Sequence, residues 1–340
     1  MKAIIMAGGM GTRLKCVSGD RPKPLVPLLG KAVMEHLVVH LRDCGFTDIC
    51  AAVKYRAGDI MACFGDGSSF GVNMQYRIED KALGTAGAVK NCEDFYGDED
   101  FLVISGDAAC DMDLKLLMEE HRKNGAAVTI ALYRDPEPLR YGLAVTDDEG
   151  MIRSFVEKPE WPRVVTDFVN TGIYALSPRA MRYVPEGREY DFGKELFPLL
   201  LENGEKMVGL PMEGYWCDIG TPLSYYQCCV DAIEGRLKID VPDEFRPSPE
   251  YCEENSSEQG YTEECECASR AELMGTLSGL MMEMGADYSD GIRLHGKNYK
   301  MHIYPSAVRS AVRISVQANN AEFARELALS AKAVAEALGM

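Results

Sequence analysis

A glycine-rich turn followed by two cations, near the start of the chain, has the composition of a phosphate-binding site. The apolar run 3–6 predicts a short buried strand, and three of the four residues 8–11 are glycines. Glycine has no Cβ, so such a turn can fold tightly and point several backbone N–H groups at one anion. Arg13 and Lys23 then supply positive charge. A plain surface turn with two solvated cations is the alternative, because the spacing matches neither the dinucleotide fingerprint nor the Walker A loop.

Two carboxylates stand where a metal ion could bind. Four apolar residues, 101–104, predict a strand that is buried on both faces, as in a parallel sheet, and Asp107 comes just past its end. Open α/β sheets bind ligands at the carboxyl ends of their strands, so Asp107 is a candidate metal ligand, with a helix-capping role as the alternative. Asp218, in a loop bounded by glycines, is the second candidate.

Three polar residues could recognise a sugar phosphate. Glu157 offers an acceptor for sugar hydroxyls and Lys158 a cation for phosphate, although an exposed ion pair of little energetic value is the alternative. Asn170 lies in the predicted strand 168–174, where asparagine is disfavoured. Because its amide both donates and accepts hydrogen bonds, as sugar hydroxyls do, Asn170 is a candidate for binding them.

Two glycines at the head of a predicted helix could admit a ligand to the backbone. Gly84 and Gly87 belong to the segment LGTAGA. Without side chains they would let a flat ring or a phosphate come close to the main chain. Close helix packing is the alternative explanation.

The composition narrows the class of protein. The net charge of −17 argues against a nucleic-acid partner, and no run of about 20 apolar residues predicts a membrane span. The N-terminus lacks a signal-peptide layout, and the twelve cysteines show no disulfide-framework spacing, so we expect a reducing cytoplasm. Neither the cysteines nor the five histidines have the spacing of a zinc site.

Alternating strands and helices must position these groups. Their order predicts an α/β fold with a doubly wound, mostly parallel sheet and right-handed crossovers. The predicted strands are 48–53, 73–78, 101–104, 126–133 and 168–174, with a hairpin over 143–156. The predicted helices are 31–44, 113–124, 192–201 and one that starts at Pro222, capped by Thr221, and ends near Gly235.

The composition changes after this region. Residues 241–267 contain nine acidic residues and one arginine, which predicts a solvated, disordered linker. We therefore expect a first domain over 1–240 and a small α+β module over 268–340. In the module we expect helices over 268–286 and 321–338 and strands over 290–294, 301–304 and 312–318.

Seven motifs in register give the chain a family resemblance. GGMGTRL, RPKPLVP, LGTAGA, SGD, EKP, VNTGIY and GYWCDIGTP occur in this order. Over residues 1 to about 240 they resemble the sugar-1-phosphate nucleotidyltransferase family, which implies a Rossmann-like sheet. The combination of RPKPLVP, FVNTGIY and EGYWCDIG is most similar to mannose-1-phosphate guanylyltransferases, in particular the bacterial kind fused to a phosphomannomutase-like region.

The last part of the chain resembles the C-terminal domain of phosphohexomutases, through SDGIRL, YPS and AVRISVQANNAEFARELA. The family's phosphate loop, R-P-S-G-T-E-P, is replaced by Tyr304-Pro-Ser-Ala-Val-Arg-Ser310, and the mutase domains with the phosphoserine and metal site are absent. The resemblance therefore implies a remnant without mutase activity, used for folding, assembly or regulation.

For the first domain the resemblance implies a reaction of a nucleoside triphosphate with a sugar 1-phosphate, giving a nucleotide sugar and pyrophosphate. GTP and mannose 1-phosphate are the expected substrates, and Arg13 and Lys23 the expected catalytic residues. Asp107 and Asp218 would share a Mg²⁺ ion. The implied nucleotide-binding residues are Ala7, Gly8, Gly9, Gly11, Thr12, Arg13, Gly84, Thr85 and Gly87. The implied sugar-phosphate residues are Gly142, Glu157, Lys158 and Asn170.

Three alternatives stay open. The enzyme could be a glucose-1-phosphate thymidylyl- or uridylyltransferase, or a heptose-1-phosphate guanylyltransferase. It could also be a non-catalytic sensor of nucleotide sugars. A sensor would be expected to lose one of the two cations or one of the two aspartates, and all four are present. A homo-oligomer is a further expectation.

Overall fold

The computed structural model describes residues 1–135, 138–157, 166–242, 260–281, 291–295, 299–305, 310–318 and 321–339. The chain divides into two compact units, each assembled from two stretches of sequence. The first unit contains Met1–Met10 and Met34–Trp216, and the second contains Gly11–Val33 and Cys217–Met340. The division therefore differs from the predicted domains, which remain a prediction, because the loop Gly11–Val33 belongs to the second unit.

In the described part of the first unit, nine strands form one sheet in the order β10-β9-β11-β6-β1-β4-β5, and β8 joins it between β11 and β12. They are β1 (Lys2–Ala7), β4 (Asp48–Val53), β5 (Asn73–Ile78), β6 (Phe101–Ser105), β8 (Val128–Arg134), β9 (Leu143–Thr146), β10 (Ile152–Val156), β11 (Phe168–Leu176) and β12 (Met207–Pro211). Strands β6, β1, β4 and β5 are parallel, whereas β11 is antiparallel to β6, β8 and β9. The fold is α/β, with the parallel sheet predicted from the run of buried strands.

Helices follow the strands of this unit, as the apolar periodicity predicts. Helix α6 packs against β8 and β11, and α4 packs against β1. The helices are α2 (Val33–Asp43), α3 (Ala57–Phe64), α4 (Gly84–Lys90), α5 (Glu93–Tyr96), α6 (Leu114–Asn124), α7 (Pro178–Met181), the π-helix η6 (Phe192–Leu196) and α8 (Phe197–Glu202). The short elements are η3 (Ser68–Phe70), β7 (Ala108–Cys110), η4 (Pro138–Arg140) and β13 (Trp216–Asp218), the last of which crosses into the second unit.

Aromatic side chains join η6 to the sheet. The ring of Phe192 lies 4.9 Å from that of Tyr174 and 5.6 Å from that of Phe197, measured between centroids. Phe155, on β10, meets Phe197 edge-on at 5.1 Å. Such tilted and edge-on pairs stabilise beyond the area that they bury. The start of η6 is therefore held by β11, which carries Asn170, and through Phe197 by β10, which directly precedes Glu157.

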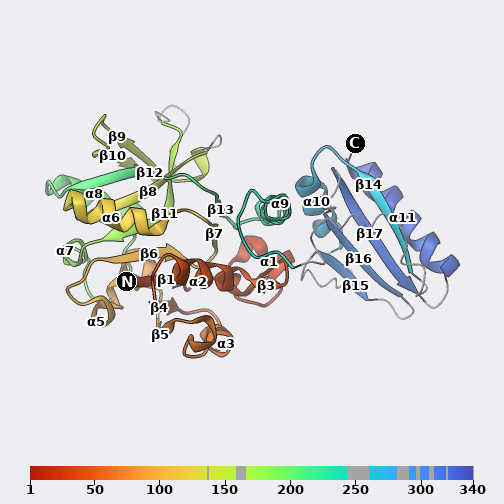
Figure 1. Cartoon of the computed structure of the whole chain (residues 1–340), viewed down its shortest axis with the longest axis horizontal. Helices are drawn as coiled ribbons and strands as arrows, with labels where there is room; N and C mark the ends of the chain where they lie inside the picture. Colours follow the sequence, from red (N-terminus) through yellow and green to blue (C-terminus); the bar gives the residue numbers. More distant parts are fainter. Residues whose placement is uncertain are drawn as a thin grey trace. The chain divides into compact units, whose positions relative to one another are not determined.

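The second unit contains a four-stranded antiparallel sheet of order β14-β17-β16-β15 in its described residues. Helices α10 and α11 pack against it, and α9 packs against α10 (Figure 1). The elements of this unit are η1 (Thr12–Leu14), α1 (Lys15–Ser18), η2 (Lys23–Leu25), β2 (Pro27–Leu28), β3 (Lys31–Ala32), α9 (Pro222–Ile233), β14 (Gly260–Glu266), α10 (Arg270–Met281), β15 (Ile292–His295), β16 (Tyr299–Pro305), β17 (Ala311–Ala318) and α11 (Ala321–Gly339). The α+β character of the module is confirmed, while its likeness to phosphohexomutases remains a prediction.

The predicted linker is wrong over its last part. Residues 260–266 form strand β14, which pairs along its whole length with β17. In the strand, Glu263 is neutralised by Lys332 of α11, whose Nζ lies 2.8 Å from its Oε2. An acidic composition predicts solvation, but it contains no information about the partner strand and the lysine that come some 50 to 70 residues later. Residues 243–259 of the predicted linker lie outside the described residues.

A buried histidine in the first unit should make stability depend on pH. His121, on α6, is 1% exposed, and its Nδ1 lies 2.9 Å from Thr129 Oγ1. Burial lowers the pKa of His121 from its ordinary 6.5 to about 4, against the opposing attraction of Asp100. Between these values the unfolded chain binds the proton and the folded chain does not. We therefore expect stability to fall as the pH drops from 6.5 to 4, by about 3 kcal/mol in total.

Urea unfolding of the native chain and of His121→Gln at pH 7 and pH 4 measures this contribution. The difference in unfolding free energy between the two proteins should shift by about that amount between the two pH values, since glutamine does not titrate. An equal pH dependence in both proteins would show that His121 contributes nothing.

Candidate active site

The glycine turn and Asp107 leave neighbouring strands at one edge of the sheet in the first unit. Strands β1 and β6 run parallel, with Met6 opposite Ser105, and Gly106 N donates a hydrogen bond to Met6 O at 2.9 Å. Asp107 is half-buried and comes directly after this contact, so it lies at the carboxyl end of β6 as predicted. The helix-capping alternative does not apply, because the carboxylate that caps α6 is that of Asp113.

A second carboxylate lies beside this turn and was not predicted. A Cβ placed at Gly8 would lie 2.9 Å from Glu79 Oε1, and Glu79 Oε2 accepts a hydrogen bond from Leu83 N at 3.2 Å. Glu79 is 9% exposed, and this burial raises the pKa of its carboxyl group. An acidic residue directly between strand β5 and the LGTAGA segment was the signal available in the sequence.

The two glycines of α4 are covered by main chain. A Cβ at Gly84 would lie 2.6 Å from Tyr190 O, and one at Gly87 would lie 2.6 Å from Arg188 O. Gly87 N also donates to Tyr190 O at 3.1 Å. Close packing, the alternative weighed from the sequence, thus accounts for the absence of side chains at both positions. We keep α4 as a proposed nucleotide-binding helix, in which backbone atoms away from the covered Cα positions of Gly84 and Gly87 would contact the nucleotide.

Three of the predicted sugar-phosphate residues lie together. Asn170 N donates to Gly142 O at 2.8 Å, and a Cβ at Gly142 would lie 2.7 Å from Glu157 Oε2. The Asn170 amide donates to the Tyr174 hydroxyl at 3.0 Å and accepts from Gly172 N at 3.0 Å. These bonds span an irregularity in β11, which explains an asparagine within a strand. Lys158, the fourth predicted residue, lies outside the described residues.

Trp216 is a further candidate that the residue-by-residue reasoning missed. It is 6% exposed, and its indole N–H has no hydrogen-bond partner among the described residues. Its ring packs edge-on against Tyr141 at 5.2 Å and tilted against Tyr133 at 5.8 Å. A buried donor without a partner is costly unless a ligand or water satisfies it. Its place two residues before Asp218 in the GYWCDIGTP motif was the signal in the sequence.

In the second unit Lys23 and Asp218 form an ion pair. The side chain of Lys23 is 10% exposed, and its Nζ lies 3.1 Å from Asp218 Oδ1. Gly11 has φ +62°, and a Cβ there would lie 2.9 Å from Lys23 Cβ, so the glycine leaves room for the lysine stem. Thr12 and Arg13 are exposed. The structure therefore brings together Gly11, one predicted catalytic cation and one predicted metal ligand.

The loop that carries Asp218 is fixed by the start of α9. Gly220 N donates to Asp218 O at 2.8 Å, and Thr221 Oγ1 accepts from Ser224 N at 3.1 Å in a capping box. This confirms the predicted cap, which holds the loop to the helix and limits the positions that Asp218 can take.

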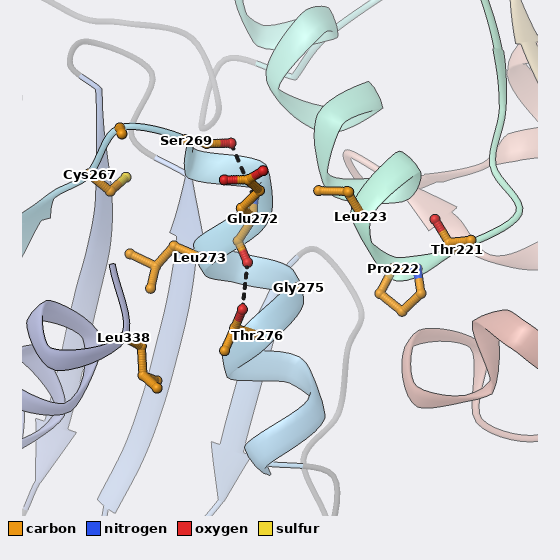
Figure 2. A pocket seen from close by; sticks show the side chains of 11 residues that line it. Thr221, Pro222, Leu223, Cys267, Ser269, Glu272, Leu273, Gly275, Thr276 and Leu338 are labelled. Carbon is orange, nitrogen blue, oxygen red and sulfur yellow. Dashed lines mark hydrogen bonds between the residues drawn. The ribbon is translucent and has the colours of Figure 1, made fainter. Parts of the chain in front are cut away.

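A pocket of about 740 Å³ lies between α9 and α10 in the same unit. Figure 2 shows Thr221, Pro222 and Leu223 on one side of it, and Glu272, Leu273 and Thr276 of α10 on the other. Within α10, Thr276 Oγ1 donates to Glu272 O at 3.0 Å. The pocket is lined by none of the predicted site residues.

The predicted metal ligands have the donor chemistry of a magnesium site. Magnesium prefers oxygen ligands and keeps several waters, and one or two carboxylates together with substrate phosphates suffice to hold it. Asp107 and Asp218 are partly exposed and meet this requirement. No cluster of three or more metal-ligating side chains occurs in the part of the chain that the structure describes.

The comparisons identify the family. The family model described as "Nucleotidyl transferase" matches residues 2–234. The chain belongs to the nucleotidyl transferase family and is an enzyme of that family. None of the helices that the structure describes is long and apolar enough to cross a membrane.

Its relatives differ in their named substrates. The chain is 39% identical, over 262 residues, to the UTP–glucose-1-phosphate uridylyltransferase of Synechocystis sp., covering 73% of this chain and 68% of the relative. It is 32% identical, over 295 residues, to the mannose-1-phosphate guanylyltransferase of Mycobacterium tuberculosis, covering 86% and 78%. Both relatives are sugar-1-phosphate nucleotidyltransferases, which confirms the resemblance seen in the motifs.

Two solved structures share the fold. A Bacillus anthracis structure described as a glucose-1-phosphate thymidylyltransferase, in complex with sucrose, has a TM-score of 0.64 and 30% identity, covering 72% of this chain and 98% of that one. HddC from Yersinia pseudotuberculosis, complexed with GMP-PN, has a TM-score of 0.59 and 32% identity, covering 67% and 97%. The Rossmann-like α/β class is thereby confirmed.

Proposed function

We propose that the enzyme transfers the nucleotidyl group of GTP to mannose 1-phosphate, giving GDP-mannose and pyrophosphate. The Mycobacterium tuberculosis guanylyltransferase supports this choice because its likeness extends over 86% of the chain. The complex of HddC with GMP-PN supports a guanine nucleotide in the same fold.

Glu79 is the residue from which we infer guanine as the base of the nucleotide. Its buried carboxyl group borders the Gly8 turn and the start of α4, both assigned to the nucleotide by the motif resemblance. The Watson–Crick edge of guanine presents two adjacent donors, N1–H and the N2 amino group, which match the two oxygens of one carboxylate. Uracil and thymine present a single donor between two acceptors. A carboxylate here therefore favours guanine, and the two donors would also favour the ionised form against the effect of burial.

In the proposed reaction an oxygen of the sugar phosphate attacks the α-phosphorus of GTP in line, and pyrophosphate leaves. Two polyanions must meet, so positioning and charge neutralisation dominate catalysis. The Lys23 ammonium, held by Asp218, would lie against the α-phosphate, and Arg13 would neutralise the leaving pyrophosphate. Asp107 and Asp218 would hold a Mg²⁺ ion, which neutralises phosphate charge when bound.

The cluster around Glu157 would bind the sugar. Glu157 would accept from sugar hydroxyls, Asn170 would present its amide, and the indole N–H of Trp216 would find its partner in a sugar or phosphate oxygen. Glu157 and Asn170 are brought together through Gly142, and Trp216 packs on the neighbouring Tyr141. Lys158 would contact the phosphate of the sugar.

A second candidate is uridylyl transfer to glucose 1-phosphate. The observation in its favour is the 39% identity to the Synechocystis enzyme, which exceeds the 32% of the guanylyltransferase although it covers less of the chain. A cytoplasmic location and a homo-oligomeric assembly, both expected from the sequence, stay predictions.

Pyrophosphate release over a grid of GTP, UTP, dTTP and CTP with mannose, glucose and heptose 1-phosphates tests the proposal. The native enzyme should prefer GTP with mannose 1-phosphate. Glu79→Gln should lower kcat/KM for GTP by about 10 to 100-fold, since its amide offers guanine one acceptor instead of two. Glu149→Gln, an exposed site in a hairpin turn, is the matched control and should leave the preference unchanged.

The outcomes separate the candidates. Preference for UTP with glucose 1-phosphate would replace the proposal by the second candidate. Absence of release with every pair would favour the sensor.

A further inference from the structure

Asp191 connects the predicted nucleotide helix to the segment that holds Glu157. Thr85 Oγ1, on α4, donates to Asp191 Oδ2 at 3.0 Å, and Phe192 N donates to Thr85 Oγ1 at 2.9 Å. These two bonds join residues more than 100 positions apart in the sequence. The Thr85 hydroxyl thus joins the first turn of α4 to the start of η6, beside the main-chain bonds from Gly87 N to Tyr190 O at 3.1 Å and from Tyr190 N to Leu83 O at 2.9 Å.

Asp191 also determines the shape of η6. Its Oδ1 accepts hydrogen bonds from Gly193 N at 2.9 Å and Lys194 N at 3.0 Å, and its own N–H donates to Glu195 Oε2 at 2.9 Å. The element that follows is a π-helical turn, a geometry often found at functional sites. The position of Gly193 therefore depends on Asp191, and through it on Thr85.

Gly193 lies directly against the carboxylate of Glu157. A Cβ at position 193 would lie 2.7 Å from Glu157 Oε2, the same distance as a Cβ at Gly142. The carboxylate is thus enclosed between two glycines, one before β9 and one in η6. Burial raises the pKa of Tyr174, whose hydroxyl accepts a hydrogen bond from the Asn170 amide at 3.0 Å.

We propose that Thr85, Asp191 and the η6 turn couple the two substrate subsites, so that nucleotide bound at α4 positions Glu157 for the sugar phosphate. Asp191 touches neither substrate and acts as a positioning residue. The inference rests on the proposed function, because it takes α4 as the nucleotide subsite and Glu157 as part of the sugar subsite. By linkage, sugar phosphate must strengthen nucleotide binding by the same factor.

Calorimetric titration tests the coupling. The affinity for mannose 1-phosphate is measured with and without GTP bearing a methylene bridge between the α- and β-phosphates, which prevents transfer. In the native enzyme the analogue should lower the Kd of the sugar phosphate about tenfold. Thr85→Val and Asp191→Ala should remove that effect. Thr85→Ser, which keeps the hydroxyl, should retain it.

Thr129→Val is the matched control, because Thr129 is also a buried threonine with a hydrogen-bonded hydroxyl, to His121, outside the network. It should lower thermal stability and leave the coupling intact. The inference is overturned, and the proposed function kept, if the coupling persists in Thr85→Val and Asp191→Ala. The same holds if the native enzyme is active but shows no coupling. A native enzyme that binds neither ligand and releases no pyrophosphate with any pair overturns the proposed function and the inference with it.

Discussion

Replacing Lys23 with alanine should lower turnover about 10³-fold while the chain still folds. The side chain is 10% exposed, and its Nζ lies 3.1 Å from Asp218 Oδ1, so the ammonium is held in one place before substrate arrives. A preorganised cation of this kind acts on charge that develops at the transferring phosphorus without reorganising during the step. Alanine removes that charge and also leaves Asp218 without this partner.

Steady-state pyrophosphate release with the preferred substrate pair measures the effect, and thermal unfolding checks the fold. Lys31→Ala is the matched control. Lys31 also pairs with an aspartate in the second unit, Asp240, at 3.0 Å, but its side chain is 37% exposed. An exposed pair contributes little, so this variant should keep nearly full turnover. Equal turnover in Lys23→Ala and the native enzyme would refute the catalytic role of Lys23.

Replacing Asp107 with asparagine should also lower turnover about 10³-fold, and should raise the Mg²⁺ concentration needed for half-maximal activity. Asp107 lies at the carboxyl end of β6, beside the end of β1 from which the glycine turn leaves. Asparagine keeps the size of the side chain and removes its charge, so the loss reports on charge and not on packing.

A Mg²⁺ titration of pyrophosphate release in both proteins separates the two effects. Asp148→Asn, an exposed aspartate in the turn between β9 and β10, is the control and should behave as the native enzyme does. If Asp107→Asn lowers turnover but leaves the Mg²⁺ requirement unchanged, Asp107 does not bind the metal ion and contributes to catalysis in another way.

Local signals account for most of the elements that were predicted correctly. Strand β4 was predicted with its observed bounds, 48–53, because its apolar run is short and uninterrupted. The start of α9 was predicted from Thr221 and Pro222, since a cap and a proline in the first turn act within a few residues. Strand β12 was missed, because Met207–Pro211 becomes a strand by pairing in parallel with β8, some 80 residues earlier.

The prediction of a linker was wrong over residues 260–266 for the same reason. Residues 260–266 are acidic, and nothing nearby favours a strand, but β17 provides the hydrogen-bonding partner and Lys332 a compensating charge. Asn170 shows the reverse. The sequence correctly marked it as unusual in a strand, while the cause within the fold is its pair of hydrogen bonds to Tyr174 and Gly172.

The sequence by itself determined the family, the α/β order of elements and the chemical types at the site, because motifs, periodicity and caps are local or additive. Only the tertiary structure decided which groups meet. Lys23 pairs with Asp218 across 195 positions, and Thr85 binds Asp191 across 106, contacts that no local pattern encodes. The opening glycines were likewise predicted as one phosphate turn, yet the fold places Gly8 beside Glu79 and Gly11 against Lys23. These contacts depend on how segments that are distant in the sequence pack together, and local sequence patterns carry no information on that packing.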